Sequence, residues 1–157
     1  MDNESIPDNA GVIIFPPLLY FTALLSGLLV SYFFPYQLLP NPVAVIIGTL
    51  IALFSFFILR KAVGQLNKHK TTINPGGTTT AIVSKGIYKF TRNPMYVSFT
   101  LFYIGISIIF NSWGGLLLLI PLLLIVQKGI IKREERYLSQ KFGNEYQGYK
   151  ATVRRWL

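Results

Sequence analysis

The hydrophobic and polar positions divide this chain into long apolar runs separated by shorter polar stretches. Four runs are apolar enough to be helices inside a bilayer, at residues 11–34, 43–59, 94–110 and 113–131. The first holds 24 residues without a charge, which exceeds the about 20 that a helix needs to cross the hydrocarbon layer. Pro16 and Pro17 near its start predict either a kink or a helix that begins a few residues later. The pattern therefore predicts an all-α integral membrane bundle of about four transmembrane helices in a single domain.

The polar stretches predict the remaining parts of the domain. Residues 1–10 are polar and acidic and are expected to be a flexible N-terminus. Residues 60–93 are expected to form a long cytoplasmic loop. From Lys128 the chain turns polar, and apolar residues recur at helical spacing. Residues 132–157 are therefore predicted to be amphipathic cytoplasmic helices, interrupted at Gly143.

The charges support this arrangement and suggest an orientation. The net charge is +9, with 15 Lys and Arg against 6 Asp and Glu. All the basic residues lie in 60–92 or from Lys128 onward, and the turns at 35–42 and 111–112 contain none. The positive-inside rule then predicts a multi-pass protein with both termini in the cytoplasm, in a bacterial inner membrane or in the endoplasmic reticulum. Topology explains the charge, so no nucleic-acid partner is expected.

Several common kinds of site are not encoded. The chain has no cysteine and a single histidine, His69, so a metal site is not expected. It contains neither a Gly-x-Gly-x-x-Gly nor a phosphate-binding Gly-x-x-x-x-Gly-Lys-Ser/Thr motif, and no Ser-His-Asp set.

One candidate site lies where the polar loop meets the third apolar run. The order Arg92, Asn93, Pro94 predicts a helix N-cap at Asn93 with proline in the first helical position. A positive helix end beside Arg92 is suited to an anionic group. The alternative interpretation is that Arg92 and Tyr96 only anchor a membrane helix at the headgroup level.

A second candidate site lies in the predicted tail, at Glu134 and Glu135. Their spacing from Ile131 and Leu138 places them at the margins of an apolar helical stripe. A carboxylate there is costly unless a cation or hydrogen-bond donors meet it. Two interpretations remain open: a site for a cationic ligand group, or ion pairs with a nearby Lys132, Arg133, Arg136 or Arg92.

Tyrosines surround both candidate sites in the sequence. Aromatic faces are suited to a cation or a flat ring, although each tyrosine singly is typical of an interfacial belt. The residues are Tyr88, Tyr96, Tyr137, Tyr146 and Tyr149.

The two motifs together resemble the isoprenylcysteine carboxyl methyltransferase and phospholipid methyltransferase group of membrane enzymes. The similarity covers roughly residues 78–157. The first motif has Gly86, Tyr88, Arg92, Asn93, Pro94 and Tyr96; the second has Glu134, Glu135, Leu138, Phe142, Gly143, Glu145, Tyr146, Tyr149 and Val153. Their order and spacing on either side of a helical hairpin carry the resemblance.

The resemblance implies S-adenosylmethionine as methyl donor and a lipidic or small hydrophobic acceptor that enters from the bilayer. It implies catalytic roles for Arg92 and Glu134. One side of the donor pocket would be lined by Gly86, Tyr88, Arg92, Asn93, Pro94 and Tyr96. Glu134 and Glu135 would face the donor from the tail, and Tyr146 and Tyr149 would close over it. Carboxyl O-methylation and amine N-methylation both remain open.

Two positions depart from the family pattern. Many relatives have histidine where this chain has Asn93, and an amide cannot act as a base near neutral pH. The prenylcysteine enzymes carry arginine about one turn before the glutamates, where this chain has Ile130. An arginine there would suit a substrate carboxylate, so its absence argues against that substrate.

Two other functions are compatible with these residues. Sterol-type membrane reductases, which use NADPH, end in a similar Arg-His-Pro-x-Tyr pattern. A non-catalytic membrane scaffold is the second alternative. The paired glutamates and the motif after them favour the methyltransferase.

Overall fold

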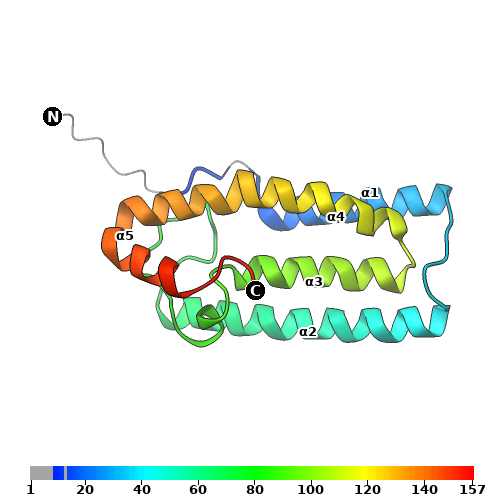
Figure 1. The fold of residues 1–157 in the computed structure, drawn as a ribbon, viewed down its shortest axis with the longest axis horizontal. Helices are drawn as coiled ribbons and strands as arrows, with labels where there is room; N and C mark the ends of the chain where they lie inside the picture. Colours follow the sequence, from blue (N-terminus) through cyan, green and yellow to red (C-terminus); the bar gives the residue numbers. More distant parts are fainter. Residues whose placement is uncertain (1–8, 13) are drawn as a thin grey trace.

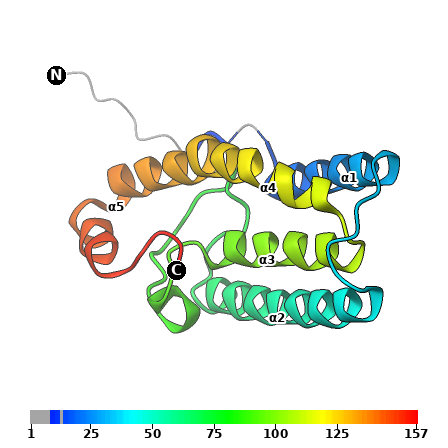
Figure 2. The same ribbon diagram turned by 45° about the vertical axis from the view of Figure 1, so that its right-hand side comes forward.

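A computed structural model describes residues 9–12 and 14–157 of the chain. Four apolar helices run side by side, as Figures 1 and 2 show. They are α1 (Pro16–Phe33), α2 (Asn41–Lys68), α3 (Pro94–Ile109) and α4 (Trp113–Ile125). The most extensive packing joins α2 to α3 and α1 to α4. The part of the chain that the structure describes contains no strand, so the predicted all-α bundle is confirmed. Most of the predicted N-terminus, residues 1–10, lies outside the described residues.

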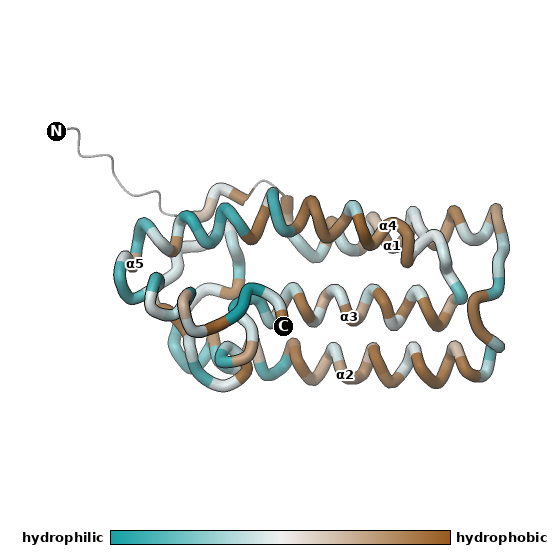
Figure 3. Tube along the Cα trace, in the orientation of Figure 1, coloured by the Kyte–Doolittle hydropathy of each residue, from teal (hydrophilic) through white to brown (hydrophobic). Residues whose placement is uncertain are grey.

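Three stretches of helix are long and apolar enough to cross a membrane: α1, α2 and the continuous helix that begins with α4. Helix α3 is apolar but has only 16 residues. Large apolar side chains such as Phe21, Leu50 and Ile120 lie exposed on the outer faces of the bundle, as expected for surfaces that meet lipid rather than water. Figure 3 shows this apolar bundle, with hydrophilic residues concentrated toward α5.

Small residues allow the helices of each pair to approach closely. A Cβ atom added at Gly27 in α1 would lie 2.4 Å from the Cα of Gly115 in α4, and one added at Gly48 in α2 would lie 2.5 Å from the carbonyl oxygen of Gly105 in α3. Close approach at small residues is a common way for membrane helices to pack, because hydrophobic burial does not drive association within lipid.

Two helix boundaries are informative. Helix α1 begins at Pro16. The proline pair therefore marks a helix that starts a few residues into the apolar run, the second of the two predictions, and not a kink. Helix α2 continues to Lys68, nine residues beyond the predicted end of the second span at residue 59. The charges at Arg60 and Lys61 end the apolar run, but arginine and lysine are good helix formers, so the helix itself continues. The stretch expected to be loop therefore begins with two and a half turns of helix.

Trp113–Thr152 is a continuous run of 40 helical residues that changes character along its length. After α4, a π-helical turn, η2 (Val126–Ile131), leads into α5 (Lys132–Thr152). Gly143 has φ +51°, a left-handed conformation that glycine adopts without strain. The predicted interruption at Gly143 is thus confirmed, and it turns the second half of α5 back toward the bundle (Figure 1).

Candidate active site

A cavity of about 550 Å³ lies at the polar end of the bundle. Its walls come from α2, the first turns of α3, both halves of α5 and the loop between α2 and α3. The start of α1 and the residues before it complete the lining, with Ala10, Phe15, Pro16 and Pro17. Segments far apart in the sequence therefore meet around one space.

The Arg92–Asn93–Pro94 corner forms one wall and is held in place by the C-terminal segment, residues 153–157. The Arg92 backbone N–H donates to the Arg154 carbonyl oxygen at 2.9 Å. The Asn93 side-chain amide donates to the Arg155 carbonyl oxygen at 2.8 Å. Asn93 occupies the predicted N-cap position of α3, but its side chain makes no capping hydrogen bond. The Asn93 amide binds the C-terminal segment instead.

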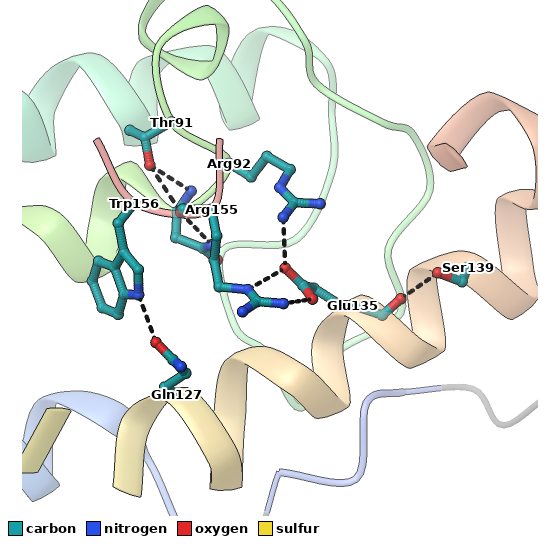
Figure 4. A network of polar contacts seen from close by, with 8 residues as sticks. Thr91, Arg92, Gln127, Glu135, Ser139, Arg155 and Trp156 are labelled. Atoms are coloured by element: carbon teal, nitrogen blue, oxygen red, sulfur yellow. Dashed lines mark hydrogen bonds and ion pairs between the residues drawn. The ribbon is translucent and has the colours of Figure 1, made fainter. Parts of the chain in front are cut away.

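Glu135 is bound by two arginines (Figure 4). Arg155 donates through Nε to Oε1 at 2.8 Å and through Nη2 to Oε2 at 2.7 Å. Arg92 approaches Oε1 through Nη2 at 3.1 Å. Burial alone would raise the pKa of Glu135, but the Arg155 hydrogen bonds and the charges of both arginines outweigh it and lower the pKa. Glu135 is therefore a carboxylate that two arginines hold in place.

Arg92 is only partly satisfied by this ion pair. Its side chain is 8% exposed, and its Nε and Nη1 atoms are buried without a hydrogen-bond partner among the described residues. Buried guanidinium nitrogens normally have acceptors, because an unpaired one carries its full desolvation cost. Since Arg92 also lines the cavity, these two nitrogens can bind an anionic ligand group.

Glu134 has different surroundings from its neighbour. The Tyr96 hydroxyl donates to Glu134 Oε1 at 2.7 Å, and Glu134 forms no ion pair with any described residue. Burial raises its pKa to about 7, with a contribution from the negative charge of Glu135, while the Tyr96 hydrogen bond opposes the shift. Within the described part of the chain, Glu134 is therefore a cavity carboxylate without a cationic partner.

Tyr88, Tyr146 and Tyr149 line the cavity beside these groups. The Tyr149 hydroxyl donates to the Tyr88 carbonyl oxygen at 2.8 Å, which joins the end of α5 to η1 (Gly86–Lys89). The rings of Tyr146 and Tyr149 pack edge to face with centroids 6.2 Å apart. Burial raises the pKa of Tyr146 to about 12, and that of Tyr88 and Tyr149 higher still. All three phenols therefore stay neutral and offer aromatic faces and hydroxyl groups rather than charge.

The structure brings the predicted site residues together, with one exception. Those that line the cavity are Tyr88, Arg92, Asn93, Pro94, Tyr96, Glu134, Glu135, Tyr146 and Tyr149. Gly86 does not line it. It has φ +62°, and an added Cβ would lie 2.6 Å from the Gln65 side-chain nitrogen. Its position is thus explained by the turn and by close packing against α2.

Comparison with known proteins agrees with this geometry. A family model described as phospholipid methyltransferase matches residues 43–145. This match covers more than half of the chain, including the corner and both glutamates. The chain belongs to the phospholipid methyltransferase family. The resemblance read from the two motifs is therefore confirmed at the level of this family, which is one of methyltransferases and supports an enzymatic function.

A second comparison adds a relative without a described activity. An uncharacterized protein of Haemophilus influenzae is 48% identical over 46 residues, which make up 29% of this chain and 68% of that protein. This similarity gives no information about the function of the chain.

One polar residue of the site was missed from the sequence, and it lies beyond the family match. Arg155 completes the ion pair with Glu135, yet it is 20 residues away along the chain and outside residues 43–145. Its only local signal is its place in an Arg154–Arg155 pair. Glu135 of this phospholipid methyltransferase family member thus has an ion-pair partner that only the tertiary fold reveals.

Proposed function

We propose that this chain is an S-adenosylmethionine-dependent methyltransferase that acts on a lipidic or small hydrophobic acceptor at the membrane. The observation that supports this proposal best is the charge pattern of the cavity. Arg92 offers two guanidinium nitrogens without partners, and Glu134 offers a carboxylate without a cation. An α-amino acid group, with one carboxylate and one ammonium, has the complementary charges.

The residues present fit this donor. Arg92 would hold its carboxylate through Nε or Nη1, and Glu134 would face its ammonium. The faces of Tyr88, Tyr146 and Tyr149 are suited to a sulfonium or an adenine ring. When bound, the donor supplies a methyl group activated on a sulfonium. The chain contributes binding, orientation and exclusion of water, which are the main requirements of a methyl transfer.

A second cavity supports an apolar acceptor. It has a volume of about 370 Å³ and lies among α1, α2 and α3, and it shares Pro17, Leu59 and Phe99 with the first. The two spaces therefore adjoin at three apolar residues. An acceptor with its tail in the apolar cavity would have its head beside Glu134 and Tyr96.

Parallel calorimetric titrations of the full chain in detergent test this function. We expect S-adenosylhomocysteine to bind and NADPH not to bind. Binding of NADPH alone would favour the reductase, and binding of neither would favour the scaffold. Glu134→Gln should weaken S-adenosylhomocysteine binding by a factor of about 10, since a charge-assisted contact is lost. Glu145→Gln is the matched control, because Glu145 lies exposed on the same helix and outside the cavity.

A further inference from the structure

The ion pair at Glu135 is asymmetric in a way that affects Arg92. Arg155 takes both carboxylate oxygens in a planar fork, at 2.8 and 2.7 Å. Arg92 is left with a single contact to one oxygen, through Nη2 at 3.1 Å. In a fork-to-fork pair, Arg92 would use two of its nitrogens on the same carboxylate.

The charges of the three groups do not cancel. Two guanidiniums and one carboxylate leave one positive charge, and the nitrogens without partners are those of Arg92. Arg155 has both of its fork nitrogens engaged by Glu135 and is the more exposed arginine, with 31% of its side chain accessible. The excess positive charge therefore lies on the arginine that lines the cavity.

The C-terminal segment holds Arg155 in this position from two sides (Figure 4). The Arg155 carbonyl oxygen accepts hydrogen bonds from the Thr91 hydroxyl at 3.1 Å and from the Asn93 amide at 2.8 Å. The next residue, Trp156, donates through its indole N–H to Gln127 Oε1 in η2 at 3.0 Å. The Arg155 backbone is thus attached to the corner, and the neighbouring Trp156 side chain is attached to the π-helical turn.

We propose that Arg155 is a positioning residue of the donor site: by holding both oxygens of Glu135, it limits Arg92 to one contact with Glu135 and leaves both Nε and Nη1 of Arg92 available, so that one of them binds the carboxylate of the methyl donor. This inference rests on the proposed function. Without Arg155, Glu135 would be free to take Arg92 in a fork-to-fork pair, which would occupy one of these two nitrogens and rotate the guanidinium toward Glu135, away from the donor's carboxylate. Arg155 acts through Glu135 and Arg92 and needs no contact with the donor.

The test compares two ligands that differ at the amino-acid group. S-adenosylhomocysteine carries the carboxylate, whereas 5′-deoxy-5′-methylthioadenosine is a similar nucleoside thioether without it. Both are titrated calorimetrically into the full chain in detergent and into three variants: Arg155→Ala, Arg155→Lys and Arg154→Ala. Arg154 is the matched control, because its side chain is exposed and lines no part of the cavity.

We expect Arg155→Ala to weaken S-adenosylhomocysteine binding by a factor of about 10 or more, the size of a lost charge-assisted contact, and to leave methylthioadenosine binding unchanged. Arg155→Lys should not restore affinity, because an ammonium cannot hold both carboxylate oxygens as a planar fork does. Arg154→Ala should bind both ligands as the unaltered chain does.

Three results would overturn the inference. Undiminished S-adenosylhomocysteine binding by Arg155→Ala, or by Arg155→Lys if the alanine variant does not fold, removes Arg155 from the donor site. An equal loss for both ligands indicates a structural role alone. Both results leave the proposed function standing. Absence of S-adenosylhomocysteine binding by the unaltered chain rejects the proposed function and this inference together.

Discussion

Glu134 and Glu135 are neighbours in the chain, yet their carboxylates have opposite electrostatic surroundings. Glu135 lies between Arg92 and Arg155, whereas Glu134 receives a single hydrogen bond from the Tyr96 hydroxyl. The pKa of Glu135 is lowered and that of Glu134 is raised to about 7. Glu135 supports the architecture of the site, whereas Glu134 forms no ion pair with any described residue.

Replacing Glu135 by glutamine should destabilise the fold. The change leaves two arginines facing a neutral amide, and breaking a buried ion pair costs about 3–5 kcal/mol. We expect the lower end of that range, because Arg155 is 31% exposed and water partly solvates it. Denaturant unfolding of the protein in micelles measures the difference. Glu145→Gln is the control, and equal stability of the two variants would contradict the prediction.

The raised pKa of Glu134 predicts a pH dependence of stability. The pKa of this carboxyl rises from an ordinary 4.5 to about 7 on folding, so the folded state binds a proton that the unfolded state has released. Its contribution to the free energy of unfolding is therefore most favourable below pH 4.5 and declines as the pH rises through about 7. The difference in stability between Glu134→Gln and the unaltered chain isolates this contribution, since other groups titrate in both. A difference that is constant between pH 4.5 and about 7 would exclude the shift.

Ligand binding should show the opposite pH trend. The ammonium of S-adenosylhomocysteine needs an ionised Glu134, so affinity should increase from about pH 6 to about pH 8. Below the pKa, binding should release a proton from Glu134, and calorimetry in buffers of different ionisation enthalpy measures that release. Glu134→Gln should show neither the pH trend nor this proton release. If the variant retains both, another group is responsible.

Sequence signals account for most of the helices and for all but one of the residues expected to line the cavity. The apolar runs, Pro94 after Asn93, and Gly143 place helix boundaries and a break where the structure has them. Arg60 and Lys61 show the limit of this approach, because charge ends an apolar run without ending a helix. Hydropathy reports the surroundings of a side chain and not the conformation of the backbone.

The roles of the two glutamates could not be separated from the sequence. Adjacent residues on a helix point in directions about 100° apart, so one of the pair faces the arginines and the other faces Tyr96. Which does so depends on how α5 is rotated against α3, and that rotation follows from packing across the whole bundle. Arg155 was missed for the same reason, because the turn at Gly143 brings the end of the chain back to the corner.

Helix packing at Gly48 gives a prediction independent of the active site. An added Cβ would lie 2.5 Å from the Gly105 carbonyl oxygen and 2.8 Å from the Ile109 backbone nitrogen. Backbone atoms cannot move aside readily, so Gly48→Ala should destabilise the bundle by about 1–3 kcal/mol.

Gly64 lies in the same helix with nothing within 4 Å of an added Cβ. Gly64→Ala should therefore stabilise the protein by up to about 1 kcal/mol through helix propensity. Unfolding of both variants in micelles distinguishes them, and equal changes would refute the close α2–α3 packing.

The proposed orientation in the membrane is open to a direct test because the chain has no cysteine. Tyr36 is exposed in the uncharged turn between α1 and α2, and Gln140 is exposed on α5 at the basic end. With the basic end in the cytoplasm, Tyr36→Cys should react with a membrane-impermeant maleimide in intact cells, whereas Gln140→Cys should react only after permeabilisation. The cysteine-free chain gives the background, and labelling in permeabilised cells shows that both thiols are accessible. The reverse pattern would place the candidate active site on the outer face, where a cytoplasmic methyl donor does not reach it.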